Sequence, residues 1–118
     1  MRLSDPGAVE AIGELLGATV RQAPFGVPRP TPGRPPPSEG PREPVYQLTM
    51  PSEGGEGTLL ITLWPTLARV DVRLGNHYWV LRDVDVVDLY PGVEVLFRRN
   101  QPPAYLFVSV KGRVALVA

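Results

Sequence analysis

Few residues of this chain belong to the types that most often carry out catalysis. His77 is the only histidine, and there is no cysteine. Nucleophilic catalysis pairs a serine or cysteine with a neighbouring base, whereas His77 directly follows Gly75-Asn76, a dipeptide typical of tight hairpin turns. We expect a histidine at a hairpin tip to be solvated. The sequence therefore predicts a protein that is not an enzyme and that uses no cofactor.

The densest group of carboxylates comprises Asp83, Asp85, Asp88 and Glu94. A Ca²⁺ or Mg²⁺ site requires several oxygen atoms that converge on one point. On a strand, Asp83 and Asp85 would share one face about 7 Å apart, and a β-bulge near residues 86–87 would displace Asp88. This spacing favours the solvent face of a strand, so we expect no metal site.

Two short patterns resemble the motifs of PilZ domains, which are β-barrels that bind cyclic dinucleotides. Arg69-x-x-x-Arg73 resembles the first motif, and residues 88–92, Asp-Leu-Tyr-Pro-Gly, are similar to the second, Asp/Asn-x-Ser-x-x-Gly. Tyr90 stands in the place of the serine, and the glycine comes one position early. The resemblance implies a β-barrel that binds a small anionic ligand of the cyclic-dinucleotide type through Arg69, Arg73 and Asp88.

The apolar residues after Pro44 alternate with a period of two, which predicts β-strands. We therefore expect a β-domain to position the side chains described above. The expected strands cover residues 45–50, 58–64, 68–74, 77–82, 84–90, 93–98, 104–110 and 113–117. The connections between them are too short for the crossovers that parallel pairing requires. The sequence thus predicts a mostly β protein, an antiparallel meander of seven or eight strands. A small barrel and a sandwich both satisfy this pattern.

A short helix is expected within residues 1–20. Ser4 or Asp5 can cap it, and Pro6 suits its first turn. One apolar stripe follows at helical spacing, made of Val9, Ile12, Leu16 and Val20. Gly13 and Gly17 weaken the helix, so it must dock, either on its own β-domain or on a neighbouring subunit. The two glycines would permit close backbone approach, or the helix simply ends at Gly17.

Residues 21–44 are expected to form a proline-rich linker between the helix and a β-domain of residues 45–118. Nine of the fifteen prolines lie between Pro24 and Pro44, and proline removes hydrogen-bond donors and restricts its preceding neighbour. An extended polyproline II segment follows from this composition. Residues 29–35 also match the Arg-x-x-Pro-x-x-Pro pattern that SH3-type domains bind, although the linker interpretation is favoured.

Charge and hydropathy narrow the classes of partner. Twelve basic and twelve acidic side chains cancel, so there is no cationic excess for nucleic-acid binding. No apolar run approaches the roughly 18 residues that span a bilayer, and acidic residues interrupt the N-terminal apolar stretches. We expect a cytoplasmic protein. Arginine greatly outnumbers lysine, a composition typical of thermophilic proteins or of GC-rich codons.

Residues 105–110, Tyr-Leu-Phe-Val-Ser-Val, are apolar on both faces of the expected strand. Such a strand is covered on both sides or belongs to an interface. The expected interface residues are Tyr105, Phe107, Val114 and Leu116. The small core and an open final strand also favour a homodimer or larger oligomer. We therefore expect a non-enzymatic protein-interaction or assembly module, with binding of a small anion through Arg69 and Arg73 as the alternative.

Overall fold

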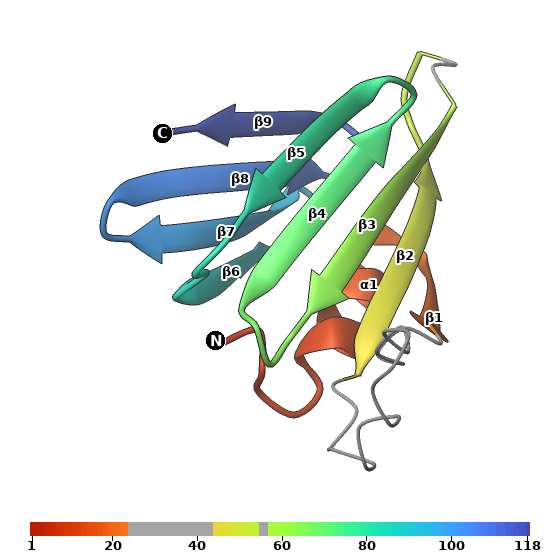
Figure 1. The fold of residues 1–118 in the computed structure, drawn as a ribbon. Helices are drawn as coiled ribbons and strands as arrows, with labels where there is room; N and C mark the ends of the chain where they lie inside the picture. The colour runs from red at the N-terminus through yellow and green to blue at the C-terminus, as the bar shows by residue number, and fades with distance from the viewer. Residues whose placement is uncertain (24–43, 55–56) are drawn as a thin grey trace, which may run out of the picture.

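The computed structural model describes residues 1–23, 44–54 and 57–118. These residues form one helix and nine strands, and the strands are arranged in two antiparallel sheets (Figure 1). The helix, α1, is Ala8–Leu16. The first sheet contains, in spatial order, β1 (Thr19–Ala23), β2 (Val45–Pro51), β3 (Thr58–Trp64), β4 (Arg69–Leu74) and β5 (His77–Leu81). The second contains β6 (Val86–Tyr90), β7 (Glu94–Asn100), β8 (Pro103–Ser109) and β9 (Val114–Val117).

The two sheets form an open sandwich in which α1 occupies one side. At one margin β5 lies against β8, and at the other α1 packs against β1 and β2 of the first sheet and β6 and β7 of the second. The described strands therefore do not close into a barrel, and the sandwich is the correct alternative of the two. The helix docks on the β-sheets of its own chain, the first of the two expected alternatives.

The core lies between the sheets and beneath the helix. Alternating residues of each strand point into it, as the period of two predicts. Its fully buried side chains include Ile12 of α1, Leu48, Ile61 and Val72 of the first sheet, and Phe97 of the second. Because α1 contributes Ile12 and Leu16 to this same cluster, the N-terminal segment and the β-strands share one core.

The helix is shorter than expected and begins differently. Its N-cap is Gly7 with φ 81°, and no side chain caps it, so the expected caps Ser4 and Asp5 are wrong. At its end Gly17 has φ 65° and donates its N–H to Glu14 O, while Ala18 N–H donates to Gly13 O. This Schellman motif ends the helix where a left-handed residue is needed.

A strand that the sequence analysis missed follows the helix at once. β1 pairs along its whole length with β2, from Thr19 opposite Thr49 to Ala23 opposite Val45. Val20 therefore belongs to β1, and residues 21–23, expected in the linker, are part of the first sheet. A Cβ atom at Gly13 would clash with Val20 Cγ2, so this glycine does permit close approach of helix and strand.

The other expected strands are confirmed, with ends that shift by one or two residues. The bulge expected near residues 86–87 is not present, because β6 pairs with β7 one to one from Val86 to Tyr90. The change of phase occurs earlier. Asp83 adopts φ 57°, and the following residue, Val84, donates its N–H to Ala68 O of the β3–β4 turn. The kink therefore comes before β6 and not within it.

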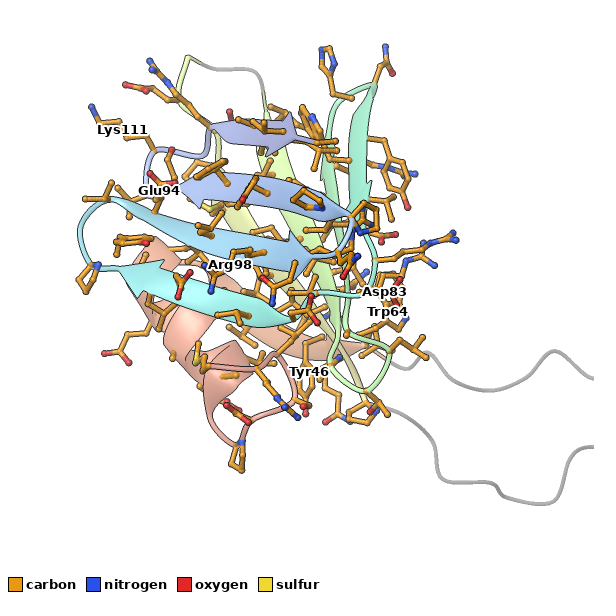
Figure 2. All side chains as sticks on the ribbon, turned by 90° about the vertical axis from the view of Figure 1, so that its left-hand side faces the viewer. Tyr46, Trp64, Asp83, Glu94, Arg98 and Lys111 are labelled. Atoms are coloured by element: carbon orange, nitrogen blue, oxygen red, sulfur yellow. The ribbon has the colours of Figure 1, made fainter. Side chains whose placement is uncertain are left out.

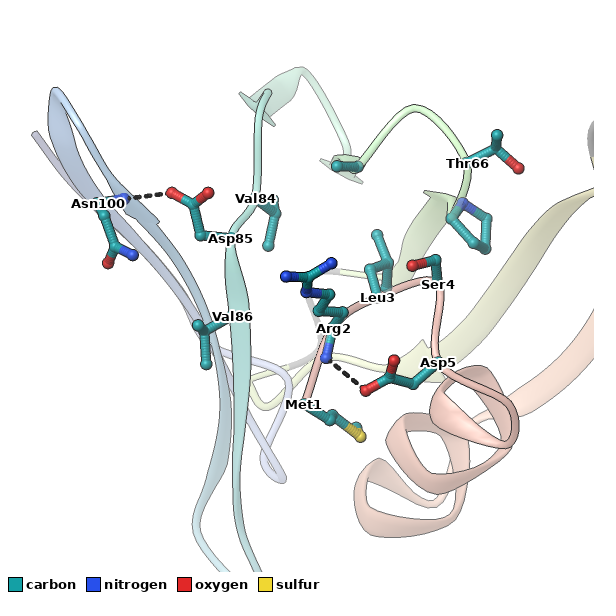
Figure 3. Close-up of a pocket in the computed structure, with 12 residues that line it drawn as sticks. Met1, Arg2, Leu3, Ser4, Asp5, Thr66, Val84, Asp85, Val86 and Asn100 are labelled. Atoms are coloured by element: carbon teal, nitrogen blue, oxygen red, sulfur yellow. Dashed lines mark hydrogen bonds between the residues drawn. The ribbon is translucent and has the colours of Figure 1, made fainter.

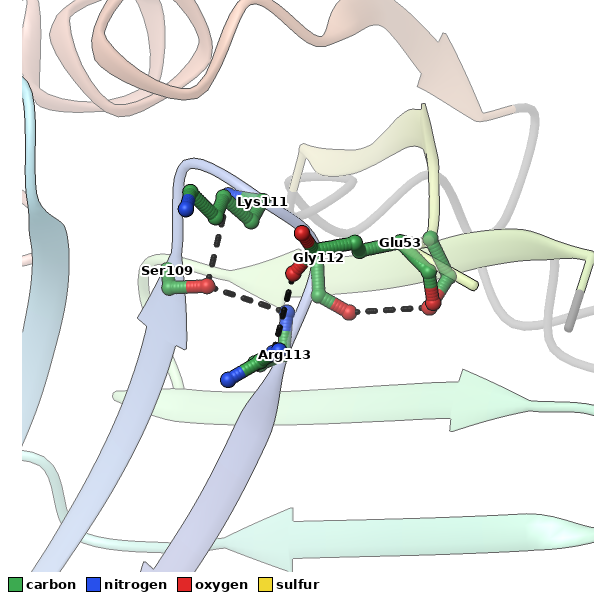
Figure 4. A network of polar contacts seen from close by, with 6 residues as sticks. Glu53, Ser109, Lys111, Gly112 and Arg113 are labelled. Carbon is green, nitrogen blue, oxygen red and sulfur yellow. Dashed lines mark hydrogen bonds and ion pairs between the residues drawn. The ribbon is translucent and has the colours of Figure 1, made fainter. Parts of the chain in front are cut away.

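The loop between β2 and β3 contacts the loop between β8 and β9, and this contact joins the two sheets at one end (Figure 4). Ser52 Oγ donates to the carbonyl oxygen of Gly112 at 3.1 Å, and Glu53 N–H donates to Lys111 O at 2.9 Å. An ion pair of 3.0 Å joins Arg113 Nε to Glu53 Oε2. A Cβ atom on Gly112 would lie 2.6 Å from Pro51 O, so only glycine lets the two loops come this close.

Two further expectations concern the remaining chain. Residues 24–43 of the proline-rich linker, with the SH3-type pattern at 29–35, lie outside the described residues. The helix of the described residues, α1, has nine residues. It is too short to cross a bilayer.

Candidate functional site

A polar cluster lies on the outer face of the first sheet. Arg69 and Asp71 point outward from β4 because their neighbours Val70 and Val72 point into the core. The guanidinium of Arg69 donates to both carboxylate oxygens of Asp71, from Nε to Oδ1 at 2.7 Å and from Nη2 to Oδ2 at 3.0 Å. Tyr78 of β5 donates its hydroxyl to Asp71 Oδ2 as well. Asp71 is thereby only 6% exposed, although it lies on the outer face of the sheet.

These contacts shift two protonation equilibria. The hydrogen bond to Asp71, aided by burial and by the negative charge, raises the pKa of Tyr78. The same carboxylate raises the pKa of Arg69. Both shifts favour the protonated partner that Asp71 binds. The cluster is therefore a hydrogen-bonded network in which Asp71 accepts from both Arg69 and Tyr78.

Aromatic side chains surround this network. The guanidinium carbon of Arg69 lies 4.7 Å from the ring centroid of Trp64, and that of Arg73 lies 5.6 Å from the ring of Tyr78. Next to them is a shallow pocket of about 230 Å³, below the usual size of a small-molecule site. Its lining consists of Gln47, Leu60, Thr62, Trp64, Asp71, Arg73 and Tyr78.

The residues of the proposed anion site are only partly brought together. Arg69 and Arg73 share the outer face of β4, but Asp71 lies between them and takes up the hydrogen bonds of Arg69. Asp88 lies on β6 of the other sheet, where its nearest basic partner is Arg98 Nη2 at 3.9 Å. With an open sandwich in place of a barrel, the arrangement that the PilZ resemblance implies is not formed.

The remaining carboxylates do not gather either. Asp83 and Asp85 are exposed, and Asp85 Oδ2 accepts a hydrogen bond of 2.7 Å from Asn100 N. Among the residues that the structure describes, no three His, Asp or Glu side chains are grouped as metal ligands would be. His77 is exposed at the start of β5 and stacks on Trp79 at 5.8 Å.

A wider groove of about 690 Å³ lies between the N-terminal residues, the β3–β4 turn and the start of β6 (Figure 3). Arg2 N–H donates to Asp5 Oδ2 at 2.8 Å across this segment. Met1 continues from it along the edge of β6, where its amino group donates to Val87 O at 3.0 Å. The backbone of Met1 thus pairs with Val87 of β6, which joins the N-terminal segment to the second sheet.

The outer face of the second sheet has a different character. The inward residues of β7 are Val95 and Phe97, both fully buried, so the alternate positions point outward. The strand register then assembles three rows across the sheet. We call these eleven residues the β6–β9 outer face: Val86, Arg98, Tyr105 and Val117; Asp88, Leu96, Phe107 and Ala115; and Tyr90, Glu94 and Ser109.

Seven of these eleven side chains are apolar or aromatic, and they reach solvent at the margins of the face. Val117 is 52% exposed and Tyr90 47%. At the centre Tyr105 and Phe107 are stacked with ring centroids 6.5 Å apart, and Leu96 beside them is 9% exposed. Figure 2 views this side of the molecule, with Arg98 over the middle of the sheet and Glu94 towards one end of the strands.

The expected interface residues divide between two faces. Tyr105 and Phe107 belong to the β6–β9 outer face, whereas Val114 and Leu116 pair with the buried residues Val108 and Leu106 and therefore point inward. The sequence pattern did not indicate that Val86, Leu96, Ala115 and Val117 lie on the same surface. Only the register of four strands reveals that they share a face with the two aromatic residues.

Comparison of this chain with models of protein families, with curated proteins and with solved structures finds no match. Function is therefore inferred from the residues and from their geometry.

Proposed function

We propose that this chain is a non-enzymatic assembly module that self-associates, with the β6–β9 outer face of one copy docking on the same face of a second copy. The observation that carries this proposal is the apolar centre of that face, formed by Leu96, Tyr105 and Phe107. An antiparallel sheet with one side on the core normally turns polar residues outward on the other side. Here the outward side is mostly apolar.

The first sheet gives the contrast within the same molecule. Its outer face carries the Arg69–Asp71–Tyr78 network and the hydroxyl and amide groups of Thr62 and Gln47. Arg69, Asp71 and Tyr78 satisfy one another, and the polar groups around them suit contact with water. The outer face of the first sheet therefore suits contact with water, whereas the β6–β9 outer face suits contact with another protein surface.

Binding of a small anion is the weaker function for the first sheet. Arg69 is neutralised by Asp71, which leaves Arg73 as the cation beside the pocket of about 230 Å³. One exposed guanidinium on a shallow pocket provides little affinity in water.

The size of the β6–β9 outer face sets the strength of the association. Four strands and five residues along each strand span roughly 19 Å by 17 Å. This is about 320 Å² on each copy and about 650 Å² in total, well below the roughly 1,200 Å² of stable complexes and in the range of weak, transient contacts. We therefore expect a reversible dimer with a dissociation constant in the micromolar range.

Sedimentation equilibrium tests this proposal over concentrations from about 10 µM to 1 mM. The mass should rise from the 12.9 kDa of one chain towards twice that value. Phe107→Lys places a charge in the middle of the face and should leave a monomer at all concentrations. The matched control is Val80→Lys, on the outward side of β5, which should associate like the wild type.

Two results would contradict the proposal. A wild-type chain that stays monomeric at the highest concentration would show that no self-association occurs. A dimer that survives Phe107→Lys would place the contact elsewhere, for example on the open edge of β9. Circular dichroism of each variant ensures that a monomeric result does not reflect loss of the fold.

A further inference from the structure

We infer that the two copies meet in one orientation, with their β7 strands antiparallel across a two-fold axis that passes over Leu96. This inference rests on the proposed self-association and adds the geometry of the contact. It follows from the order of charges along a single strand. The outward residues of β7 are Glu94, Leu96 and Arg98, an acid, an apolar residue and a base at equal spacing.

This order is complementary to its own reverse. Successive outward residues of a strand lie about 6.6 Å apart, so Glu94 and Arg98 lie at equal distances on either side of Leu96. Turning a second copy by 180° about an axis across the strands places its Glu94 opposite Arg98 and its Arg98 opposite Glu94. The same surface then serves both copies, as a two-fold interface requires.

Arg98 is poorly satisfied within its own chain. Its Nη2 lies 3.9 Å from Asp88 Oδ2, which is long for an ion pair. Its Nε is shielded from solvent and has no hydrogen-bond partner among the described residues. Glu94 is half-buried and forms no ion pair with any described residue. The Arg98 side chain is 39% exposed, so a carboxylate from a second copy could reach its guanidinium and supply an acceptor.

The neighbouring strands fit the same orientation. Phe107 shares the row of Leu96, so each copy of Phe107 meets its counterpart near the axis and buries the aromatic centre. Tyr105 of one copy faces Ser109 of the other, where its hydroxyl finds a polar neighbour. Asp88 meets its own counterpart, but on the edge strand β6, where water screens the repulsion.

The opposite orientation is disfavoured by the same charges. An axis along the strands would place Glu94 opposite Glu94 and Arg98 opposite Arg98. Like charges that face each other across an interface oppose association strongly. The charges of β7 therefore favour the antiparallel over the parallel stacking of the two faces.

Charge exchange along β7 tests this orientation. Glu94→Arg and Arg98→Glu each create like-charge contacts, and each should raise the dissociation constant of the dimer by about tenfold or more. The double variant Glu94→Arg/Arg98→Glu reverses the order but keeps it complementary, and should return within about threefold of the wild type. Glu14→Arg, on the exposed side of α1, is the matched control and should have no effect.

A second measurement places the residues directly. In the inferred orientation Val86 of one copy faces Tyr90 of the other, across sheets that pack about 10 Å apart. The chain has no cysteine, so Val86→Cys and Tyr90→Cys each introduce a single thiol. A short bismaleimide should link a mixture of these two chains to each other and link neither chain to itself.

The outcomes separate this inference from the proposed function. Weakening by both single exchanges, recovery in the double variant and mixed crosslinking would support the orientation. A wild-type dimer that is indifferent to the single exchanges, or that crosslinks equal positions, would overturn the orientation and leave self-association intact. A wild type without any dimer would overturn both.

Discussion

Asp71 shows where residue types alone mislead. The alternation of charged and apolar residues in 68–74 correctly predicts the outward direction of Asp71, and its solvation would follow if nothing lay over it. Tyr78 from β5 and Arg69 from the same strand fold over the carboxylate instead. No pattern in the sequence reveals that Tyr78 is the residue of β5 that contacts Asp71.

The raised pKa of Tyr78 makes this contact measurable. We predict that Tyr78 ionises above the ordinary tyrosine pKa of about 10 in the folded protein, and that Asp71→Asn returns its pKa towards that value. The shift favours the protonated hydroxyl in the folded state. Its contribution to stability is therefore present below about pH 10 and is lost as the pH rises through the folded pKa.

Absorbance at 295 nm against pH measures the ionisation of tyrosine. The free energy of unfolding of wild type and Tyr78→Phe should differ by a constant amount below about pH 10 and converge above it. Tyr90→Phe, at an exposed position, serves as the control and should keep the late-ionising group. A wild-type titration curve that Asp71→Asn leaves unchanged would contradict the role given to Asp71.

At the scale of elements, the strands were predictable and the transition from helix to first strand was not. Period-two alternation and turn dipeptides such as Gly75-Asn76 and Pro91-Gly92 define eight strands. Thr19–Ala23 carries no such signal, since Val20 continues the apolar stripe of the helix and Pro24 follows at once. Its identity as a strand comes from pairing with β2, a contact more than twenty residues away in sequence.

Gly112 provides a test of how the two hairpins are joined. Both Gly112 and Gly75 adopt positive φ, 76° and 57°, but only Gly112 has backbone atoms where a Cβ would lie. Gly75→Ala should cost about 1–2 kcal/mol from backbone conformation alone. Gly112→Ala should cost a further 1–3 kcal/mol or so, because the Cβ displaces the loop at Pro51.

Chemical denaturation of the two glycine variants, with unchanged m-values, gives this difference. Equal losses at the two positions would show that the contact between the β8–β9 hairpin and Ser52 does not hold the sheets together.

At the scale of the whole molecule, the sequence predicts the fold class but not how the layers close. A barrel and a sandwich use the same alternating strands, and the choice depends on where α1 docks. The structure places α1 between the first sheet and β6 and β7. The candidate surface has the same origin, because strand order and register together bring Val86, Leu96, Phe107 and Val117 onto one face.

The central claim is that a second copy of the chain docks on the β6–β9 outer face. Its most direct test is a dilution series of amide NMR spectra, which reports both that association occurs and where. We predict concentration-dependent shifts at Leu96, Arg98 and Phe107, and constant signals for Thr62 and Arg73 on the outer face of the first sheet. Shifts that map to the first sheet, or spectra that stay identical up to about 1 mM, would contradict the claim.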